Sequence, residues 1–223
     1  MVFMFSDDVG KDSFCIKGED FKYLVKVRRH VVGDKIGFRS PTDTKLLYSY
    51  EIVSIENRSL CVKMVGYEEK ELKAKKELHI GWCIIDTKSI EKVLPSLCEM
   101  GVSKISFISC ERSQRNFKLD FKRFERILHS SMQQSGRSDF MEFDTFKNIQ
   151  DFIKKYPHAK VFDFCEKTLS DYDDVDTVLV GCEGGFSDSE REFLKEYDVF
   201  AFATPMVLRS QSAVVAVASK VLL

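Results

Sequence analysis

The chain has 223 residues, of which 44% are hydrophobic, including 19 phenylalanines. This length exceeds one typical domain but scarcely fills two, and the apolar content excludes a disordered chain. The formal net charge of −1 conceals a segregation, because residues 112–137 hold seven bases against two acids, while residues 161–198 hold twelve acids against three bases. Binding of a polyanion would therefore depend on a local basic patch and not on the total charge.

The seven cysteines are scattered, with no C-x-x-C pair and no histidine at a spacing that suits zinc. We expect reduced, buried thiols and no metal site, because disulfides require an oxidising compartment. No apolar run approaches the roughly 20 residues of a spanning helix, and the charged N-terminus lacks the apolar core of a signal peptide. The sequence predicts a cytoplasmic protein without a membrane segment.

Residues 1–70 predict a small β domain with one helix. Several short strands at this spacing indicate a small barrel: 2–5, 13–17, 35–38, 46–55 and 58–65. The helix is expected over residues 19–30, where Lys26, Arg28 and Arg29 could neutralise the phosphates of a polyanion. A merely solvated helix face is an equal alternative.

The almost fully charged segment 67–77 marks a change of composition, and we assign residues 71–223 to a second domain. Strands and helices alternate there, which predicts an α/β domain with a mostly parallel sheet. A basic helix is expected over 119–135. Together with Arg112, Arg115, Gln134 and Arg137, this helix could bind an RNA backbone. The alternative is an exposed helix whose charged side chains form ion pairs with one another.

A glycine-rich turn follows the buried strand expected at 177–180. Gly181, Gly184 and Gly185 leave backbone amides open to a ligand, and Ser187 with Glu190 forms a capping box that starts the next helix. An ordinary connection in an α/β domain is the alternative for the glycines alone. A second strand at 198–202 also ends in a loop that opens a helix, and loops after parallel strands emerge at the ligand-binding edge of a sheet.

These two loops carry a resemblance to a known family. Residues 180–190 read V-G-C-E-G-G-F-S-D-S-E and residues 203–213 read A-T-P-M-V-L-R-S-Q-S-A. They resemble the signature pair of the RsmE family of 16S ribosomal RNA uridine-N3 methyltransferases, which is approximately I-G-P-E-G-G-[FL]-S-x-x-E and L-G-x-R-[IV]-L-R-x-E-T-A. The first segment is nearly complete. The second departs from the family at Thr204, Met206, Gln211 and Ser212.

The resemblance spans the whole chain and implies its fold. It implies a PUA-like RNA-binding barrel at 1–70 and a SPOUT methyltransferase domain at 71–223, whose last helix threads a loop to form a trefoil knot. S-adenosylmethionine sits in this knot, and the proteins work as homodimers on 16S ribosomal RNA of the small subunit. The implied cofactor-binding residues are Leu179, Val180, Gly181, Glu183, Gly184, Gly185, Ala203, Thr204, Val207, Leu208 and Ser210.

The chemistry of uridine N3 methylation suggests catalytic roles for two of the matching residues. The imide proton of N3 must leave, and a cation beside the ring oxygens would stabilise the resulting charge, which is the role expected of Arg209. We expect Glu183 to orient Arg209 or to hold the glycine turn in place, in preference to acting as a general base. Gln211 stands where the family has glutamate and cannot act as a base.

Two functions remain open from the sequence. The first is an active S-adenosylmethionine-dependent uridine-N3 methyltransferase. The second is a catalytically weakened relative that binds RNA or the small ribosomal subunit without methylating it, which the departures in the second signature favour.

Overall fold

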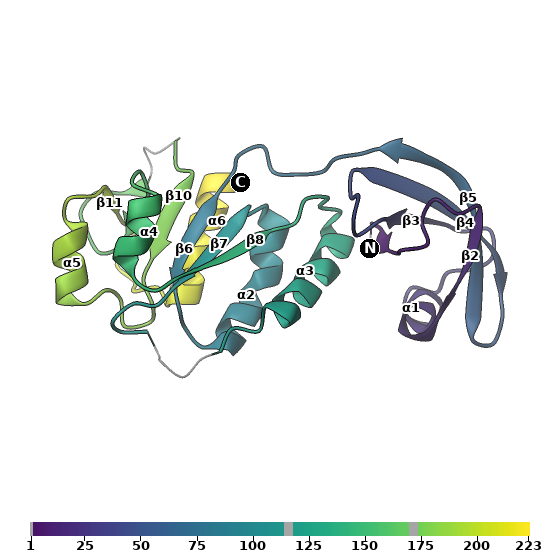
Figure 1. Cartoon of the computed structure of the whole chain (residues 1–223), viewed down its shortest axis with the longest axis horizontal. Helices are drawn as coiled ribbons and strands as arrows, with labels where there is room; N and C mark the ends of the chain where they lie inside the picture. The colour runs from purple at the N-terminus through teal and green to yellow at the C-terminus, as the bar shows by residue number, and fades with distance from the viewer. Residues whose placement is uncertain (1, 114–117, 170–173) are drawn as a thin grey trace. The chain divides into compact units, whose positions relative to one another are not determined.

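The computed structural model describes residues 2–113, 118–169 and 174–223 (Figure 1). Contacts divide the chain into two compact units, one of Met1–Lys73 with Met132–Asp139 and one of Ala74–Ser131 with Phe140–Leu223. The grouping of the end of the basic helix with the N-terminal unit was not predicted from the sequence.

The first unit is one five-stranded sheet with a short helical segment. Its strands are β1 (Met4–Phe5), β2 (Ser13–Lys17), β3 (Lys35–Arg39), β4 (Leu46–Ile55) and β5 (Ser59–Glu69), in the order β1-β3-β4-β5-β2. Only the β1–β3 pair is parallel. Leu60 and Val62 alternate along β5 and are buried, so one face of the sheet forms the core. Closure of this sheet into a barrel stays a prediction.

The expected helix over residues 19–30 is shorter and irregular. Helix α1 (Gly18–Lys22) continues as a π-helical turn, η1 (Tyr23–Val27). Arg29 follows with φ of 61°, which among the described residues is a positive value found otherwise only at glycines. The turn presents Lys26, Arg28 and Arg29 to solvent.

The cysteines of this structure correct one expectation. Cys15 is bonded to Cys61, where we expected reduced thiols, and the sulfur atoms of Cys83 and Cys110 also lie next to each other. Cys15 lies directly opposite Cys61 in the antiparallel β2–β5 ladder, with their Cα atoms 4.0 Å apart. Cys83 is the last residue of β6, and Cys110 lies two residues beyond the end of the neighbouring parallel strand β7. Strand register brings these pairs together, and the spacing of cysteines in the sequence does not reveal it.

The second unit contains the parallel sheet that the sequence predicted. Its strands are β6 (His79–Cys83), β7 (Lys104–Ile108), β8 (Glu142–Phe146), β9 (Lys160–Phe162), β10 (Thr177–Val180) and β11 (Val199–Phe200). They pair in the order β11-β9-β10-β6-β7-β8, and each pair is parallel. Consecutive strands are neighbours in the sheet except for β8 and β9 and for β10 and β11, between which the chain passes over other strands. As a result, β10 and β11 lie on either side of β9.

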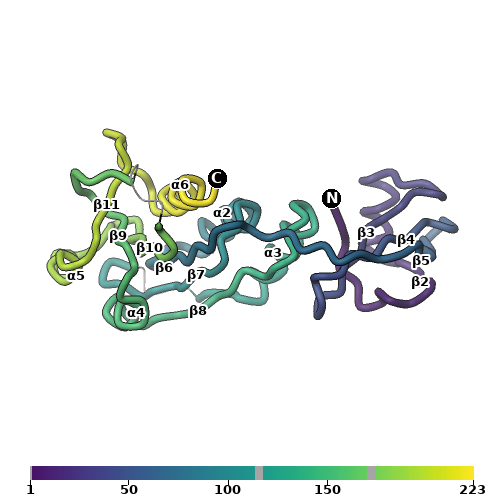
Figure 2. Tube along the Cα trace, turned by 90° about the horizontal axis from the view of Figure 1, so that it is seen from above, coloured from purple at the N-terminus to yellow at the C-terminus, as the bar shows by residue number. Residues whose placement is uncertain are grey.

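The helices cover both faces of this sheet. They are α2 (Thr87–Met100), α3 (Phe121–Ser135), α4 (Ile149–Lys155), α5 (Asp188–Leu194) and α6 (Ser210–Leu222). Helix α2 continues through Pro95 and ends at Gly101, whose φ of 97° is the left-handed conformation in which a glycine commonly ends a helix. Figure 2 shows α2 and α6 together on one face and α4 on the other. No helix of the described residues has both the length and the apolar character of a membrane span.

Alternation along β6 explains why α4 packs so closely. Trp82 points to one face, where its ring and that of Phe107 lie 6.2 Å apart. Gly81 points to the other face, where a Cβ would lie 2.4 Å from Cζ of the buried Phe152 on α4. The missing side chain therefore makes room for the Phe152 ring.

We predict that Gly81→Ala lowers the free energy of unfolding by about 1–3 kcal/mol, because the added methyl overpacks a ring that cannot move to solvent. Gly66→Ala on β5 is the matched control, since a Cβ there meets nothing within 4 Å. Guanidinium unfolding of the full-length variants would measure both. Equal stability of the two variants would show that Phe152 can yield.

Candidate active site

Three neighbouring parallel strands end at one cavity. The segments after β9, β10 and β11 enclose about 420 Å³, closed on one side by the start of α6. The residues that line it come from all three segments: Phe162, Asp163, Phe164, Cys165, Val180, Gly181, Cys182, Glu183, Gly184, Gly185, Phe186, Arg191, Ala201, Phe202, Thr204, Pro205, Met206, Val207, Leu208, Ser210 and Ala213. Both loops singled out in the sequence therefore meet here, at the strand ends where α/β folds bind ligands.

The glycine turn is compact because its glycines touch one another. A Cβ on Gly181 would lie 3.3 Å from Cα of Gly185, which leaves little space for any side chain. Gly185 has φ of 65°, a conformation that favours glycine, and its N–H donates to the Cys182 carbonyl at 2.9 Å. Burial raises the pKa of the Cys182 thiol, so this side chain stays neutral.

The capping box predicted from the sequence is confirmed, and it does more than start α5. The Ser187 hydroxyl accepts from the Glu190 N–H at 3.1 Å, and Oε2 of Glu190 accepts from the Ser187 N–H at 2.8 Å. The second oxygen of Glu190 accepts from the N–H of Glu111 at 2.8 Å. Glu190 is only 4% exposed. This carboxylate therefore fastens the loop after β7 to the loop after β10.

The same two loops meet again at their surface. Hydrogen bonds from the Ser187 and Ser189 hydroxyls lower the pKa of Glu111. Arg112 donates to the Gly184 carbonyl at 3.0 Å and lies 3.8 Å from the carboxylate of Asp188. Arg112 therefore borders the glycine turn.

One buried hydroxyl joins the glycine turn to α6 and to the middle of the sheet. The indole Nε1–H of Trp82 donates to Ser210 Oγ at 2.8 Å, and Ser210 Oγ donates to the Gly181 carbonyl at 2.5 Å. Trp82 is fully buried, and Ser210 is 4% exposed. This chain of hydrogen bonds fixes where α6 begins, and so fixes the position of its N-cap, Arg209.

Most of the expected cofactor-binding residues line the cavity. They are Val180, Gly181, Glu183, Gly184, Gly185, Thr204, Val207, Leu208 and Ser210. Leu179 instead lies buried within β10, and Ala203 is exposed beside the lining residues. Arg209 is also exposed, at the start of α6. The loop that departs from the second signature contains one internal hydrogen bond made by a departing residue. The Thr204 hydroxyl accepts it from the Met206 N–H at 3.1 Å.

The residues expected to bind RNA fall into different environments. Gln134 is exposed, whereas Arg137 is only 5% exposed and donates to the carboxylate of Asp139 at 2.7 Å. The burial of Arg137 has a simple cause, because the residues around it pack within the first unit, where the Leu72 N–H donates to the Ser138 hydroxyl. Binding of RNA by Arg137 stays a prediction. Arg115 lies outside the described residues. The three cations of the η1 segment remain exposed.

Sequence reasoning missed Trp82 and the second role of Glu190. Trp82 reads as an ordinary core residue of a buried strand, and its partner Ser210 lies 128 positions away. No group of three or more potential metal ligands occurs within residues 2–113, 118–169 and 174–223.

We predict that Ser210→Ala lowers the free energy of unfolding by about 1–3 kcal/mol, because it leaves the buried indole N–H of Trp82 without an acceptor. Ser212→Ala, at an exposed position of α6, should change stability by less than about 0.5 kcal/mol. Denaturant unfolding of both variants tests this. An additive double variant of Ser210→Ala with Trp82→Phe would contradict the coupling.

Comparison with known proteins agrees with this architecture. A family model for an RNA methyltransferase domain matches residues 72–222. Two curated relatives from strains of Helicobacter pylori, each named ribosomal RNA small subunit methyltransferase E, are 39% and 40% identical over 208 residues, covering 92% of this chain and of each relative.

Solved structures share the fold. A Legionella pneumophila methyltransferase solved with S-adenosylmethionine matches with a TM-score of 0.77 at 18% identity, covering 98% of this chain and 94% of that one. A ribosomal RNA small subunit methyltransferase E of Neisseria gonorrhoeae, also bound to S-adenosylmethionine, matches with a TM-score of 0.76 at 15% identity, covering 98% and 95%. From its sequence relatives and its matching domain, the chain belongs to the ribosomal RNA small subunit methyltransferase E family.

Proposed function

We propose that this chain is an S-adenosylmethionine-dependent enzyme that methylates N3 of a uridine in 16S ribosomal RNA of the small subunit. The observation that carries the proposal is the cavity at the ends of β9, β10 and β11, where both signature loops converge in a member of this family. Relatives in the family are named for action on small-subunit ribosomal RNA, and the resemblance of the signatures adds the uridine N3 specificity.

The cavity fits S-adenosylmethionine. Gly181, Gly184 and Gly185 expose main chain that can hydrogen-bond the polar groups of the cofactor, and their lack of side chains leaves room for it. Phe162 and Leu208 provide apolar walls of the kind that adenine prefers. When bound, the cofactor supplies an electrophilic methyl group on a sulfonium sulfur. The neutral Cys182 thiol adds no charge beside it.

Arg209 and Glu183 can serve the acceptor uridine. Arg209 stands at the start of α6, held in register by the buried Ser210, and its cation can stabilise charge on the ring oxygens as N3 loses its proton. Glu183 lines the cavity, and no described residue hydrogen-bonds or pairs with its carboxylate. The turn is held by Cys182, Arg112 and Glu190 instead, so we assign Glu183 to orienting Arg209 or the uridine.

The finer features of the fold belong to the same proposal. We assign the first unit as a PUA-like RNA-binding domain and the second as a SPOUT domain with a trefoil knot. Strand β11 lies at the edge of the sheet, whereas α6 packs against α2 and β10. Between β11 and α6 the chain therefore has to return across β9. That return path is what a threaded final helix requires.

We further propose a cytoplasmic homodimer. Met206 and Val207 are 71% and 74% exposed in the loop beside the cavity. Apolar side chains this exposed favour cover by a ligand or a second copy. The catalytically weakened relative remains the alternative function, favoured by Gln211, whose Oε1 is buried without a hydrogen-bond partner among the described residues.

We predict that Arg209→Ala lowers the rate of methyl transfer to small-subunit RNA by about 10²–10³-fold, because one stabilising donor at the developing charge is lost. Binding of S-adenosylmethionine, measured by calorimetry, should stay within about twofold. Lys220→Ala, near the other end of α6, is the control and should leave both unchanged. Cofactor binding by the wild-type chain without any methyl transfer would favour the weakened relative.

We predict that Lys26→Ala and Arg28→Ala each weaken RNA binding and each reduce the slope of log affinity against log salt by about 1, since each exposed cation releases about one counterion. Lys35→Ala on β3 of the same unit serves as the control. Filter binding over a range of salt concentrations would test this. Unchanged slopes would show that Lys26 and Arg28 form only a solvated face.

A further inference from the structure

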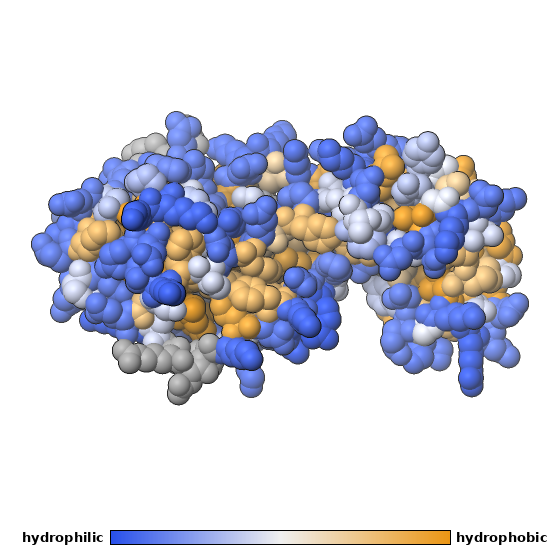
Figure 3. All heavy atoms as spheres, in the orientation of Figure 1, coloured by the Kyte–Doolittle hydropathy of each residue, from blue (hydrophilic) through white to orange (hydrophobic). Residues whose placement is uncertain are grey.

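A second cavity, of about 530 Å³, lies in the second unit between α3 and the edge strand β8. Its lining residues lie on α3, on β8 and just before β8, and none of them lines the cavity at the glycine turn. Small-ligand sites commonly enclose about 300–1,000 Å³. Figure 3 shows apolar side chains gathered on this face between α3 and β8.

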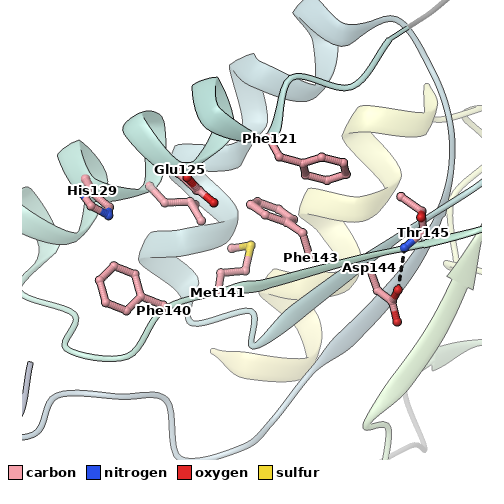
Figure 4. Close-up of a pocket in the computed structure, with 9 residues that line it drawn as sticks. Phe121, Glu125, His129, Phe140, Met141, Phe143, Asp144 and Thr145 are labelled. Carbon is pink, nitrogen blue, oxygen red and sulfur yellow. Dashed lines mark hydrogen bonds between the residues drawn. The ribbon is translucent and has the colours of Figure 1, made fainter. Parts of the chain in front are cut away.

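The cavity has an apolar floor and aromatic sides. Leu128 and Met141 are buried, and form the floor. Figure 4 shows Phe121 and Phe143 on one side and His129 and Phe140 on the other, with Met141 between the two pairs. The Phe121 and Phe143 rings lie 5.9 Å apart, and those of His129 and Phe140 lie 5.3 Å apart.

These rings are open to a ligand. Phe140 is 38% exposed, and Phe121 and Phe143 are half-buried. Behind them, the fully buried Phe107 and Phe124 hold the rings in place, with the Phe107 ring stacked on that of Phe143 at 5.9 Å. A rigid aromatic surface of this kind suits a flat ring that can stack on it.

The acceptor for such a ring is Glu125. Its side chain lies between the two aromatic pairs in Figure 4, and no described residue hydrogen-bonds or pairs with its carboxylate. Asp144 is different, because its carboxylate turns away from α3 and lies 3.1 Å from Lys155 and 3.6 Å from Lys104. Glu125 is therefore the carboxylate that can serve a ligand here.

Positive charge lies close to the same cavity. Lys122 is exposed on α3 three residues before Glu125, and therefore on the same side of the helix. The site thus combines stacking surfaces, one acceptor carboxylate and a nearby cation. A nucleotide matches all three, because its base stacks and donates hydrogen bonds while its phosphate is anionic.

We infer that this cavity, which we call the α3–β8 pocket, binds an unpaired guanine of the RNA substrate. The inference rests on the proposed action on RNA and adds a second contact to it, away from the reacting uridine. Guanine places N1–H and N2–H side by side, so a carboxylate can accept both at once. Adenine and cytosine place a ring acceptor beside their amino group, and uracil offers N3–H between two carbonyls.

An added protein strand is the competing occupant of this edge, and the backbone argues against it. The N–H of Glu142 donates into the sheet, to Ser103, so alternation turns the N–H of Thr145 outward. That outward N–H already donates to the Asp144 carboxylate at 2.8 Å. An incoming strand would find this donor occupied.

The test compares two single-stranded oligoribonucleotides of about twelve nucleotides, one all uridine and one with a single central guanosine. Fluorescence anisotropy with the full-length chain should show about tenfold tighter binding of the guanosine oligonucleotide. Glu125→Gln should remove most of this preference, and Phe121→Ala should weaken binding of the guanosine oligonucleotide. Glu142→Gln, an exposed carboxylate on β8 outside the pocket, is the matched control and should keep the preference.

Equal affinity for the two oligonucleotides, or a preference that survives Glu125→Gln, would overturn the inference. Protection of β8 from hydrogen exchange by the assembled small subunit, but by neither oligonucleotide, would assign the pocket to a protein strand and also overturn it. Cofactor binding and methyl transfer, measured on the same preparations, separate this failure from failure of the proposed function. The pocket can fail while both activities stand, and the guanine preference can hold while both are absent.

Discussion

The geometry of the active site depends most directly on the buried hydroxyl group of Ser210. It accepts from the indole of Trp82 in β6 and donates to the carbonyl of Gly181, so the middle of the sheet, the glycine turn and the start of α6 share one buried point. Arg209 precedes Ser210, and its backbone position follows from this arrangement. A cation that stabilises charge developing on the substrate must already be in position when the substrate binds. Buried hydrogen bonds supply the rigidity for this.

A second set of contacts holds the opposite side of the same turn. Glu190 accepts from both Ser187 and Glu111 with its two carboxylate oxygens, and Arg112 reaches the Gly184 carbonyl. The loop after β7 thus braces the loop after β10, although β6 lies between the two strands. The glycines can then remain free of side chains without the turn becoming loose, which suits a site that presents main chain to its ligand.

Local signals in the sequence were enough to predict the parallel sheet and the capping box at Ser187, because each depends on residues a few positions apart. The convergence of the two signature loops followed from the rule for parallel strand ends. The burial of Arg137, the pairing of Cys15 with Cys61 and the bond from Trp82 to Ser210 could not be foreseen, because each depends on which elements meet across the fold. Periodicity identifies an apolar face but not its partner.

Trp82 has a practical consequence, because it is the single tryptophan of the chain. Its indole is fully buried and hydrogen-bonded within one residue of the proposed catalytic arginine. When the indole is excited selectively over the seven tyrosines, the intrinsic emission of the unlabelled protein therefore comes from beside the active site. Displacement of the start of α6, whether by a ligand, an RNA or a second copy, can be followed in real time as a change in that emission.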